Sequence, residues 1–512
     1  VIPITGKRLS IGGLLLVISI STFTFGSIGY WYPAEYAYWN ARGALFDWTT
    51  FMYRVVWTGV TGHWCDILIG LVMIPVGRNS VLARVFHLHT STLLFAHKVL
   101  AYALCVGALV HGISYYVFVA AVASSPPVAM HEFLIDNPMI SVAQSTGDGP
   151  LSFLVLPTGV ISFVLILVVV ITSLSVLRRK KFNTFYFVHI SVAVIILILT
   201  CLHASTNFYC LLPGLLLWAG DWVWRLCNAL AKKTEATVEN AGNGWYRVRL
   251  PPKHAGLVKD VEKSEAAVPK SGSDRVLATY YINFPSVSKL QIHPFTAATA
   301  ETTGSGPVLL FQRGPERKKS KQSEKEWTWA LATRVDASWE KRSTLDVRIE
   351  GPYSPFVPEM YTANHTLLLV GGTGITGALT IANWWAKEHG SRADQSKSLH
   401  LIWTVRTQEM TSVDEVQDLQ TIMAAFRNME FVVHVSSELG RLQPASQLSS
   451  FLASRVGSCG ARALVYVSGP DGLIQGTETA CVEYRRGLRR AKDDKTGLAV
   501  TELDCYVARW SL

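Results

Sequence analysis

Four histidines in the apolar first half of the chain have a spacing that could bind iron. His97 and His111 are separated by 14 positions in one apolar stretch, and His189 and His203 by the same interval in another. Fourteen residues advance an α-helix by about 21 Å and turn it to within about 40° of its starting face. Each stretch, if helical, therefore carries two imidazoles on one stripe, and two co-directional helices would pair His97 with His189 and His111 with His203.

Facing imidazoles at two levels suit the axial ligation of two b-type haems, which pass one electron at a time. Zinc would require a third and a fourth ligand nearby. The alternative is that the four histidines only form hydrogen bonds between helices. Because ionisable groups buried in a membrane are costly and usually functional, the repeated interval favours haem iron. The eight cysteines form no CxxC or CxxCH pattern, which argues against structural disulfides and covalently attached haem.

Six apolar stretches could position these histidines as membrane-spanning helices, each of which needs about 20 residues. They cover roughly residues 9–30, 55–77, 86–121, 153–177, 184–205 and 208–230. Lysine and arginine lie at alternate ends of these stretches, and the loop from 122 to 150 contains neither. By the positive-inside rule, the N-terminus, the "RRKK" loop and everything after the sixth helix are cytosolic, so the two histidine helices run in the same direction. The net charge of +10 thus reflects membrane topology, and we expect no nucleic-acid partner.

The residues after 234 have soluble composition and two successive patterns. Short alternating runs such as "WYRVRL" (245–250) and "TYYINF" (279–284) predict a small antiparallel barrel. The order then becomes strand, glycine turn and helix, in "TLLLV" (366–370), "GGTGITGAL" and "TIANWWAKE". Gly372, Gly374 and Gly377 satisfy GxGxxG in the strand-to-helix setting that lets backbone N–H groups bind a diphosphate.

The strand after this helix, "LHLIWTV", is followed by Arg406 rather than by an acidic residue. An acid there would bind a ribose 2′-hydroxyl, whereas arginine favours a 2′-phosphate and hence NADPH over NADH. The alternative is an ordinary surface charge. A later strand, "ALVYVSGP" (463–470), ends in Gly-Pro at the edge where open α/β sheets bind ligands.

With "FPSVSKLQIHPFTAAT" (284–299), these features resemble the ferric reductase and NADPH oxidase superfamily of transmembrane flavocytochromes. The resemblance covers roughly residues 55 to 512. It implies a multi-domain fold: a six-helix transmembrane di-haem bundle, then a ferredoxin-reductase-like module made of an antiparallel β-barrel for FAD and a Rossmann-like α/β domain for NADPH. We assign residues 1–231, 232–362 and 363–512 to these three domains.

The resemblance also implies roles for residues of the flavin domain. In the "HPFT" motif, His293, Pro294 and Phe295 would shape the FAD pocket, and Thr296 would approach the isoalloxazine. Arg334 resembles the strand arginine that pairs with the FAD diphosphate. The "GPY" turn that would close the domain comprises Gly351, Pro352 and Tyr353, with Ser354 where the family commonly has Gly.

In the last domain, "GGTGITG" is similar to the NADPH diphosphate loop, with Gly377 where the family usually has Pro. The loop comprises Gly371, Gly372, Thr373, Gly374, Ile375, Thr376 and Gly377. Ser468, Gly469 and Pro470 resemble the Cys-Gly-Pro motif beside the nicotinamide, with Ser468 replacing the cysteine. Trp510 resembles the aromatic residue that covers the flavin, although it could equally pack against the barrel. Thr296, Ser468 and Trp510 would then surround the hydride transfer.

Together these features predict an NADPH-dependent ferric-chelate reductase. Electrons would pass from cytosolic NADPH through FAD and two haems to ferric iron, with cupric copper as a further acceptor, across what we expect to be the plasma membrane. Oxidases of the superfamily carry a histidine where this chain has Tyr115, which favours ferric iron over dioxygen. Two alternatives stay open: superoxide production from dioxygen, and a non-redox transporter or haem carrier with a regulatory domain. Membrane lipid is an expected partner, and homo-oligomerisation is left open.

Overall fold

The computed structural model divides the chain into two compact units, Ser10–Val223 and Trp224–Leu512 together with Val1–Leu9. It describes residues 11–46, 49–77, 80, 90–123, 154–180, 182–227, 233–252, 276–289, 291–299, 306–313, 327–354, 357–391, 396–453, 461–493 and 500–508.

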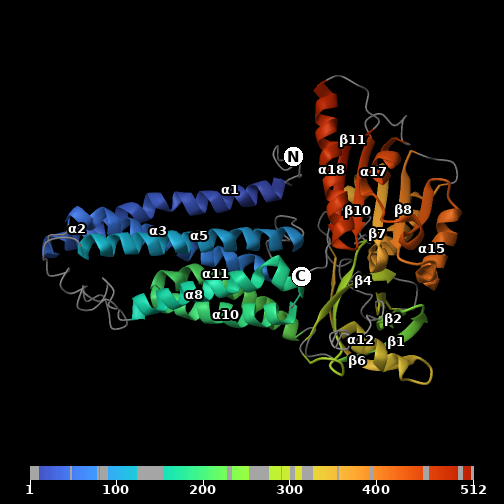
Figure 1. Ribbon diagram of the computed structural model, residues 1–512, viewed down its shortest axis with the longest axis horizontal. Coiled ribbons are helices and arrows are strands. Elements are labelled where there is room, and N and C mark those ends of the chain that lie inside the picture. The colour runs from blue at the N-terminus through green and yellow to red at the C-terminus, as the bar shows by residue number, and fades with distance from the viewer. Residues whose placement is uncertain are drawn as a thin grey trace, which may run out of the picture. The chain divides into compact units, whose positions relative to one another are not determined.

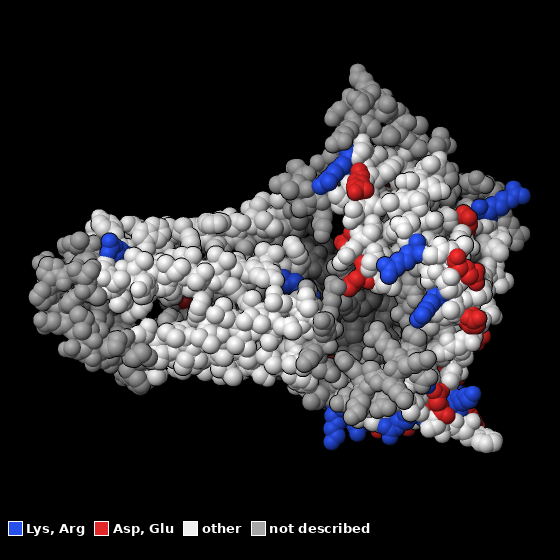
Figure 2. All heavy atoms as spheres, in the orientation of Figure 1, with Lys and Arg blue, Asp and Glu red and all other residues white. Residues whose placement is uncertain are grey.

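The first unit is built of helices that are rich in apolar residues (Figure 1). They are α1 (Ile11–Gly26), α2 (Ile28–Phe46), α3 (Thr49–Met73), η1 (Ile74–Val76), α5 (Thr90–Ala123), α8 (Val155–Ser173), α9 (Ser175–Lys180), α10 (Phe182–His203) and α11 (Ser205–Arg225). On the face drawn in Figure 2, the described surface of this unit is almost free of charged side chains. Exposed apolar side chains cover most of these helices, as expected for helices that face lipid.

Helices occupy all six predicted intervals, but only five of the described helical segments are long and apolar enough to cross a membrane. The sixth, α11, contains Pro213 and the buried charges Asp221 and Arg225, so its composition falls short of a spanning helix. The predicted end of the first span at residue 30 is wrong, because α2 continues the helical segment to Phe46. The predicted count of six spans is therefore only partly supported.

The helices of this unit pack as two neighbouring pairs, α3 with α5 and α8 with α10. The buried core where these helices meet includes Leu68 on α3, Leu100 and Leu104 on α5, and Ile196 on α10. Apolar side chains thus hold together the helices that carry the four histidines.

The second unit begins with a closed antiparallel barrel, as the alternating runs predicted. Its strands are β1 (Thr234–Gly242), β2 (Trp245–Arg249), β3 (Thr279–Asn283), β4 (His293–Thr299), β5 (Val308–Gln312) and β6 (Arg342–Tyr353), in the order β1-β2-β5-β4-β3-β6. Helix α12 (Trp327–Asp336) contributes Leu331 and Val335 to the barrel core. Residues 253–275 and 314–326 lie outside the described residues.

A five-stranded parallel sheet follows the barrel, with the order β11-β10-β7-β8-β9. The strands are β7 (His365–Gly371), β8 (Ser398–Val405), β9 (Met429–Val435), β10 (Ala461–Ser468) and β11 (Val500–Ala508). The connecting helices and turns include α13 (Pro358–Thr362), η7 (Gly372–Gly374), α14 (Ile375–His389), η8 (Gln408–Thr411), α15 (Asp414–Ala424), α16 (Ser436–Leu439), α17 (Pro444–Ala453) and α18 (Asp471–Asp493). This arrangement confirms the predicted α/β fold after the barrel.

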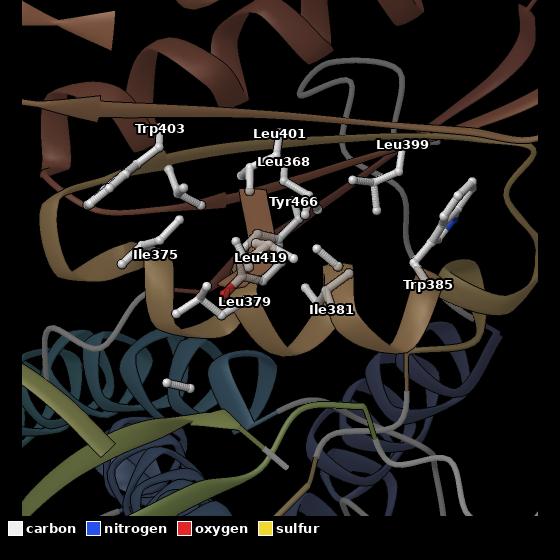
Figure 3. Close-up of a cluster of buried hydrophobic side chains, with 14 of the residues drawn as sticks. Leu368, Ile375, Leu379, Ile381, Trp385, Leu399, Leu401, Trp403, Leu419 and Tyr466 are labelled. Carbon is white, nitrogen blue, oxygen red and sulfur yellow. The ribbon is translucent and has the colours of Figure 1, made fainter. Parts of the chain in front are cut away.

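Helix α14 is apolar on several faces because it is covered on two sides. In Figure 3 its side chains Ile375, Leu379 and Ile381 point toward Leu368 and Leu401 of the sheet. On its other side, α14 packs against β4 of the barrel. There the Thr380 hydroxyl donates a hydrogen bond of 2.6 Å to the Ala297 carbonyl. The helix that follows the glycine loop thus touches the strand that carries the "HPFT" motif.

A buried arginine network makes a second connection between the barrel and the sheet. The Arg247 guanidinium, on β2, donates to both carboxylate oxygens of Glu415, and through Nη2 to Asp414 at 2.9 Å. Both acids lie in the first turn of α15, where the helix dipole also favours negative charge. Arg247 also donates to Glu239 on β1 at 2.8 Å. These carboxylates raise the pKa of Arg247, so it stays charged although it is buried.

Replacing Arg247 should therefore weaken the second unit strongly. We expect Arg247→Met to lower the free energy of unfolding by about 3 kcal/mol, because Glu415 would lose its buried partner. The measurement is urea unfolding of the full chain in detergent. Arg249→Met is the matched control: that guanidinium is half exposed, binds only Glu239 among the described carboxylates, and should contribute less than about 1 kcal/mol. Equal losses in the two variants would contradict the role given to Arg247.

Candidate functional site

The structure brings the four histidines together as two pairs. The ring centres of His97 and His189 are 6.3 Å apart, and those of His111 and His203 are 6.0 Å apart. The rings in each pair are steeply inclined, at 68° and 78°. Because the earlier residue on α5 meets the earlier residue on α10, the two helices run in the same direction, as the 14-residue interval requires.

These distances suit two imidazoles that bind one metal ion from opposite sides. A bond of about 2 Å from each nitrogen to the metal, like that of zinc to imidazole, places the ring centres about 6 Å apart. Among the described residues, no cluster of three or more potential ligands gathers elsewhere to hold a metal ion. The donor set at each level is thus two imidazoles, which is the axial ligation of a b-type haem.

One ring nitrogen of every histidine in these pairs has a partner on a neighbouring helix. On the α5 side, His97 Nδ1 donates to the Val72 carbonyl at 3.1 Å, and His111 Nδ1 donates to the Thr58 carbonyl at 3.0 Å. Both acceptors lie on α3, and they are separated by the same 14 positions as the histidines. Helix α3 therefore sets the orientation of both imidazoles on α5.

Helix α8 does the same for the histidines of α10. His203 Nδ1 donates to the Val155 carbonyl at 2.6 Å, and His189 Nδ1 lies 3.3 Å from the Ser173 hydroxyl. A hydrogen bond from Nδ1 selects the tautomer whose Nε2 lone pair is available to a metal. The three carbonyl acceptors thus prepare His97, His111 and His203 to bind through Nε2, whereas the Ser173 hydroxyl can either accept a hydrogen bond from His189 Nδ1 or donate one to it.

Glycine lets two of these rings approach the neighbouring helix. A Cβ at Gly159 on α8 would lie 2.7 Å from Cε1 of His203, and one at Gly62 on α3 would lie 3.1 Å from Cε1 of His111. Each glycine follows, four residues later, the carbonyl that accepts the hydrogen bond of the same ring. The sequence offered no separate signal for these glycines, since glycine is common in membrane helices for many reasons.

A polar cluster that the sequence did not reveal lies in the same unit. His63 Nδ1 lies 3.0 Å from Asp66, and His63 Nε2 lies 3.0 Å from Glu35. The Trp31 ring stacks on His63 with centres 3.6 Å apart, and Trp39 Nε1 donates to Glu35 at 2.9 Å. Glu35, Trp31 and Trp39 belong to α2, whose second half lies beyond every predicted span. Its contacts place His63 among carboxylates inside the helical unit.

The "HPFT" motif lies at the start of β4, on the barrel. His293 packs against Trp327 at 4.5 Å between ring centres, and burial lowers its pKa to about 4, so the imidazole is neutral. Phe295 contacts the barrel core, and the centre of its ring lies 5.9 Å from the centre of the Trp327 ring. Thr296 is buried, and its hydroxyl has no hydrogen-bond partner among the described residues. A buried hydroxyl without a partner is a position at which a bound ligand or an ordered water would form a hydrogen bond.

The predicted setting of Arg334 is wrong. It lies on helix α12 rather than on a strand, and its guanidinium is exposed and donates to the Ser286 carbonyl. The apolar residues of "WTWALATRV" form a helical stripe, with Trp327, Leu331, Ala332 and Val335 buried. This helical periodicity, rather than a strand pattern, determines the conformation of the segment.

The "GPY" turn closes β6 on the same side of the barrel. Gly351 has φ +120°, which only glycine adopts readily, and a Cβ there would lie 2.8 Å from the Thr279 carbonyl. Tyr353 is packed edge-to-face against Tyr281, with ring centres 5.5 Å apart. The close approach of β6 to β3 at this point accounts for the glycine.

The glycine loop and the "VSGP" segment meet at the carboxyl ends of β7 and β10. These neighbouring parallel strands pair Val370 with Ser468, and the strand order reverses between them. A Cβ at Gly374 would lie 2.5 Å from the Ser468 carbonyl, so the two segments touch. Open α/β sheets bind ligands at such a switch point. The Ser468 hydroxyl is buried and donates to the Ala508 carbonyl at 3.3 Å.

Two aromatic residues shape the glycine loop. Trp403 Nε1 donates to the Gly372 carbonyl at 2.9 Å, where Gly372 adopts φ +53°. The Tyr466 hydroxyl fills the space beside Gly377, where a Cβ would overlap it. Burial raises the pKa of Tyr466, which therefore stays protonated. This contact explains why the chain has glycine at 377, where the family usually has proline.

Arg406 follows β8 directly, at the same edge of the sheet, and is exposed. This position agrees with the predicted contact to a 2′-phosphate, which stays a prediction. Trp510 lies outside the described residues.

Two segments of the chain match known protein families. Residues 61–200 match the ferric reductase like transmembrane component, and residues 268–357 match an FAD-binding domain. The first segment contains His97, His111 and His189, and His203 lies three residues beyond its end. The second segment contains "HPFT" and "GPY". The predicted resemblance to the ferric reductase superfamily is thus confirmed.

Curated relatives are similar at low identity. The "Ferric reduction oxidase 8, mitochondrial" of Arabidopsis thaliana is 26% identical over 302 residues, which are 58% of this chain and 37% of that protein. A "Probable metalloreductase AIM14" of Lachancea thermotolerans is 26% identical over 342 residues, 64% of this chain and 53% of that protein. The chain therefore spans only about a third to a half of these relatives. A solved cytochrome P450 reductase, GcoB of Amycolatopsis, shares 15% identity over 55% of this chain and 70% of that one, with a TM-score of 0.35.

The close contact at Gly159 generates a prediction. Gly159→Ala should displace the His203 imidazole, because its methyl group would overlap the ring, and such overpacking costs about 1–3 kcal/mol. We expect the chain to lose the haem that His111 and His203 would hold, so that at least half of the total haem absorbance disappears. The measurement is the visible spectrum of the purified chain. Gly112→Ala is the control, since nothing lies within 4 Å of a Cβ there. Unchanged haem content in Gly159→Ala would contradict the predicted ligand position of His203.

Proposed function

We propose that this chain, which carries the transmembrane and FAD-binding parts of the ferric reductase superfamily, transfers electrons from NADPH across a membrane to ferric iron. One observation carries the proposal. Two pairs of imidazoles, with ring centres 6.3 and 6.0 Å apart, lie in a helical unit whose helices are long and apolar enough to span a membrane. The relatives named as ferric reduction oxidases and metalloreductases support a ferric chelate as the acceptor, and we propose cupric copper as a further one.

Two b-type haems and FAD are the cofactors proposed. His97, His189, His111 and His203 would hold the haems, and Thr296 with the rest of "HPFT" and "GPY" would hold FAD. When bound, FAD accepts electrons from NADPH as a pair and releases them singly, as haem requires. The chain itself contributes the axial imidazoles, their fixed tautomers and an apolar enclosure.

NADPH is the proposed electron donor. The glycine loop offers backbone N–H groups and the start of α14 to a diphosphate, and Arg406 offers charge to the 2′-phosphate. Ser468 lies beside the loop and would border the nicotinamide, with Trp510 as the proposed cover of the flavin. Ser468 already hydrogen-bonds to Ala508, so its proposed part is to shape the pocket rather than to exchange protons.

The proposed orientation follows the charge of the loops. Lysine and arginine at 178–181 and at 232–233 would face the cytosol together with the FAD and NADPH domains, and the plasma membrane is the proposed location. The pair His97–His189 would then lie near the cytosolic side, and His111–His203 about 21 Å farther along the helices, near the acceptor. Tyr115 follows the second pair by one helical turn and packs near Phe118 in an apolar cluster. Nothing in these contacts favours dioxygen.

The proposal is tested by spectra and by the identity of the acceptor. The purified full chain should show a reduced b-type haem spectrum when NADPH and FAD are added without oxygen. It should then produce Fe(II) from a ferric chelate, detected with a ferrous-specific dye. Absence of haem would refute the redox function. Dye reduction that requires dioxygen and disappears with superoxide dismutase would instead establish the oxidase.

Removing one ligand near the acceptor should separate the two halves of the reaction. We expect His111→Leu to reduce ferric-chelate reduction at least tenfold while flavin bleaching by NADPH continues at the wild-type rate, because only the second imidazole pair is broken. Flavin absorbance and Fe(II) formation measure the two steps. Val106→Leu, a lipid-exposed change on the same helix, is the control. Full ferric-chelate reduction in His111→Leu would disprove the ligand role.

The role of Arg406 is tested through the choice of nucleotide. Arg406→Ala should raise the KM for NADPH about tenfold and leave that for NADH nearly unchanged, since a charge-assisted contact to the 2′-phosphate is lost. Steady-state kinetics with both nucleotides measures this. Arg427→Ala provides the control, because that exposed arginine precedes β9 at the opposite edge of the sheet. Equal changes for NADPH and NADH would rule out phosphate recognition by Arg406.

A further inference from the structure

Two threonine hydroxyls on the barrel are buried and have no hydrogen-bond partner among the described residues. They belong to Thr296, in the "HPFT" motif of β4, and to Thr279, on β3. The residues are only 6% and 3% exposed. A buried hydroxyl without a partner is destabilising, so two on adjacent strands indicate a shared polar ligand.

The register of the barrel places these two hydroxyls side by side. Thr279 is the direct partner of Thr296 across β3 and β4. Thr279 is also the direct partner of Tyr353 across β3 and β6. Residues directly opposite on antiparallel strands project their side chains from the same face. One row across three strands therefore carries Thr296, Thr279 and Tyr353, and its outer two members come from "HPFT" and "GPY".

This row lies on the outside of the barrel. Tyr280 and Ile282, the alternate residues of β3, belong to the barrel core, as does Ala297 next to Thr296. Since successive side chains of a strand point to opposite faces, Thr279 and Thr296 point away from that core. Barrel packing thus does not account for either hydroxyl.

We propose that Thr279 is a second hydroxyl that contacts the isoalloxazine of FAD, beside Thr296. The inference rests on the proposed function, because it requires that the flavin lie against "HPFT" and "GPY". The evidence for Thr279 is separate. This residue belongs to no sequence motif, and only the strand register places it between "HPFT" and "GPY". Thr279 is a binding and positioning residue, with a polar edge atom of the flavin ring as its partner.

The test is FAD binding by the full chain in detergent, after removal of bound FAD. Quenching of FAD fluorescence gives the Kd. We expect Thr279→Val, which keeps the shape and removes the hydroxyl, to raise the Kd about tenfold, and Thr279→Ser to keep it within about twofold of wild type. Thr344→Val makes the same change at an exposed position of β6 and should leave the Kd unchanged.

A second measurement separates ligand binding from folding. In the FAD-free chain, Thr279→Val should leave Tm unchanged or raise it, because an unpaired buried hydroxyl is replaced by a methyl group of similar size. A lower Tm, or failure to fold, would show that the hydroxyl serves the chain itself and would overturn the inference. A wild-type Kd in Thr279→Val, with a raised Kd in Thr296→Val, would overturn it while leaving the FAD site intact. If the wild-type chain binds no FAD, the proposed function fails as well.

Discussion

The hydrogen bond from Nδ1 of each paired histidine to a neighbouring helix is the interaction on which the first unit depends. An imidazole among apolar side chains carries an N–H that must find an acceptor, because an unpaired polar group there is costly. The Thr58, Val72 and Val155 carbonyls accept from three of the rings, and the Ser173 hydroxyl is the polar partner of the fourth. Each helix that carries two of the histidines consequently needs a neighbouring helix that contacts both of them. Helix α3 does this for α5, and α8 does it for α10. An N–H on Nδ1 also leaves Nε2 unprotonated, so that its lone pair is available to a metal.

These hydrogen bonds require each ring to approach the neighbouring helix closely. A carbonyl already engaged in its own helix can accept a second donor only if the incoming ring lies tightly against that helix. Gly62 and Gly159, each four residues after the acceptor, remove the side chain that would obstruct the ring. At the level formed by His111 and His203, both rings therefore lie against a glycine of the neighbouring helix. Metal ligation, where it occurs, would use rings whose rotation is already restricted.

In the second unit, the corresponding constraint is the position of α14 between the sheet and the barrel. Its start belongs to the glycine loop, and Thr380 in its middle binds the carbonyl of Ala297, next to Thr296. One core cluster extends from Trp245 and Ala298 of the barrel to Leu368 and Leu401 of the sheet. Transfer between two bound molecules requires reacting atoms about 3–3.5 Å apart, which a shared core and the Arg247 network can maintain. The edge of the sheet that carries the glycine loop and the strand that carries "HPFT" are thereby parts of one packed body.

Periodicity and local motifs are what the sequence determined by itself: the co-directional histidine stripes, the barrel followed by a parallel sheet, and the glycine loop between β7 and α14. These depend on residues near one another in the chain, whose spacing reflects helix and strand geometry directly. Two predictions from the sequence were wrong. Arg334 was expected on a strand but lies on the short helix α12, and the first helical segment was expected to end near residue 30 but continues through α2 to Phe46. Only the tertiary structure decided which atoms meet: the carbonyls that receive the imidazoles, the Glu35–His63–Asp66 cluster, Tyr466 against Gly377, and Thr279 between two motifs. Carbonyl groups carry no side-chain identity and strand register is set by long-range pairing, so neither can be read from a single sequence.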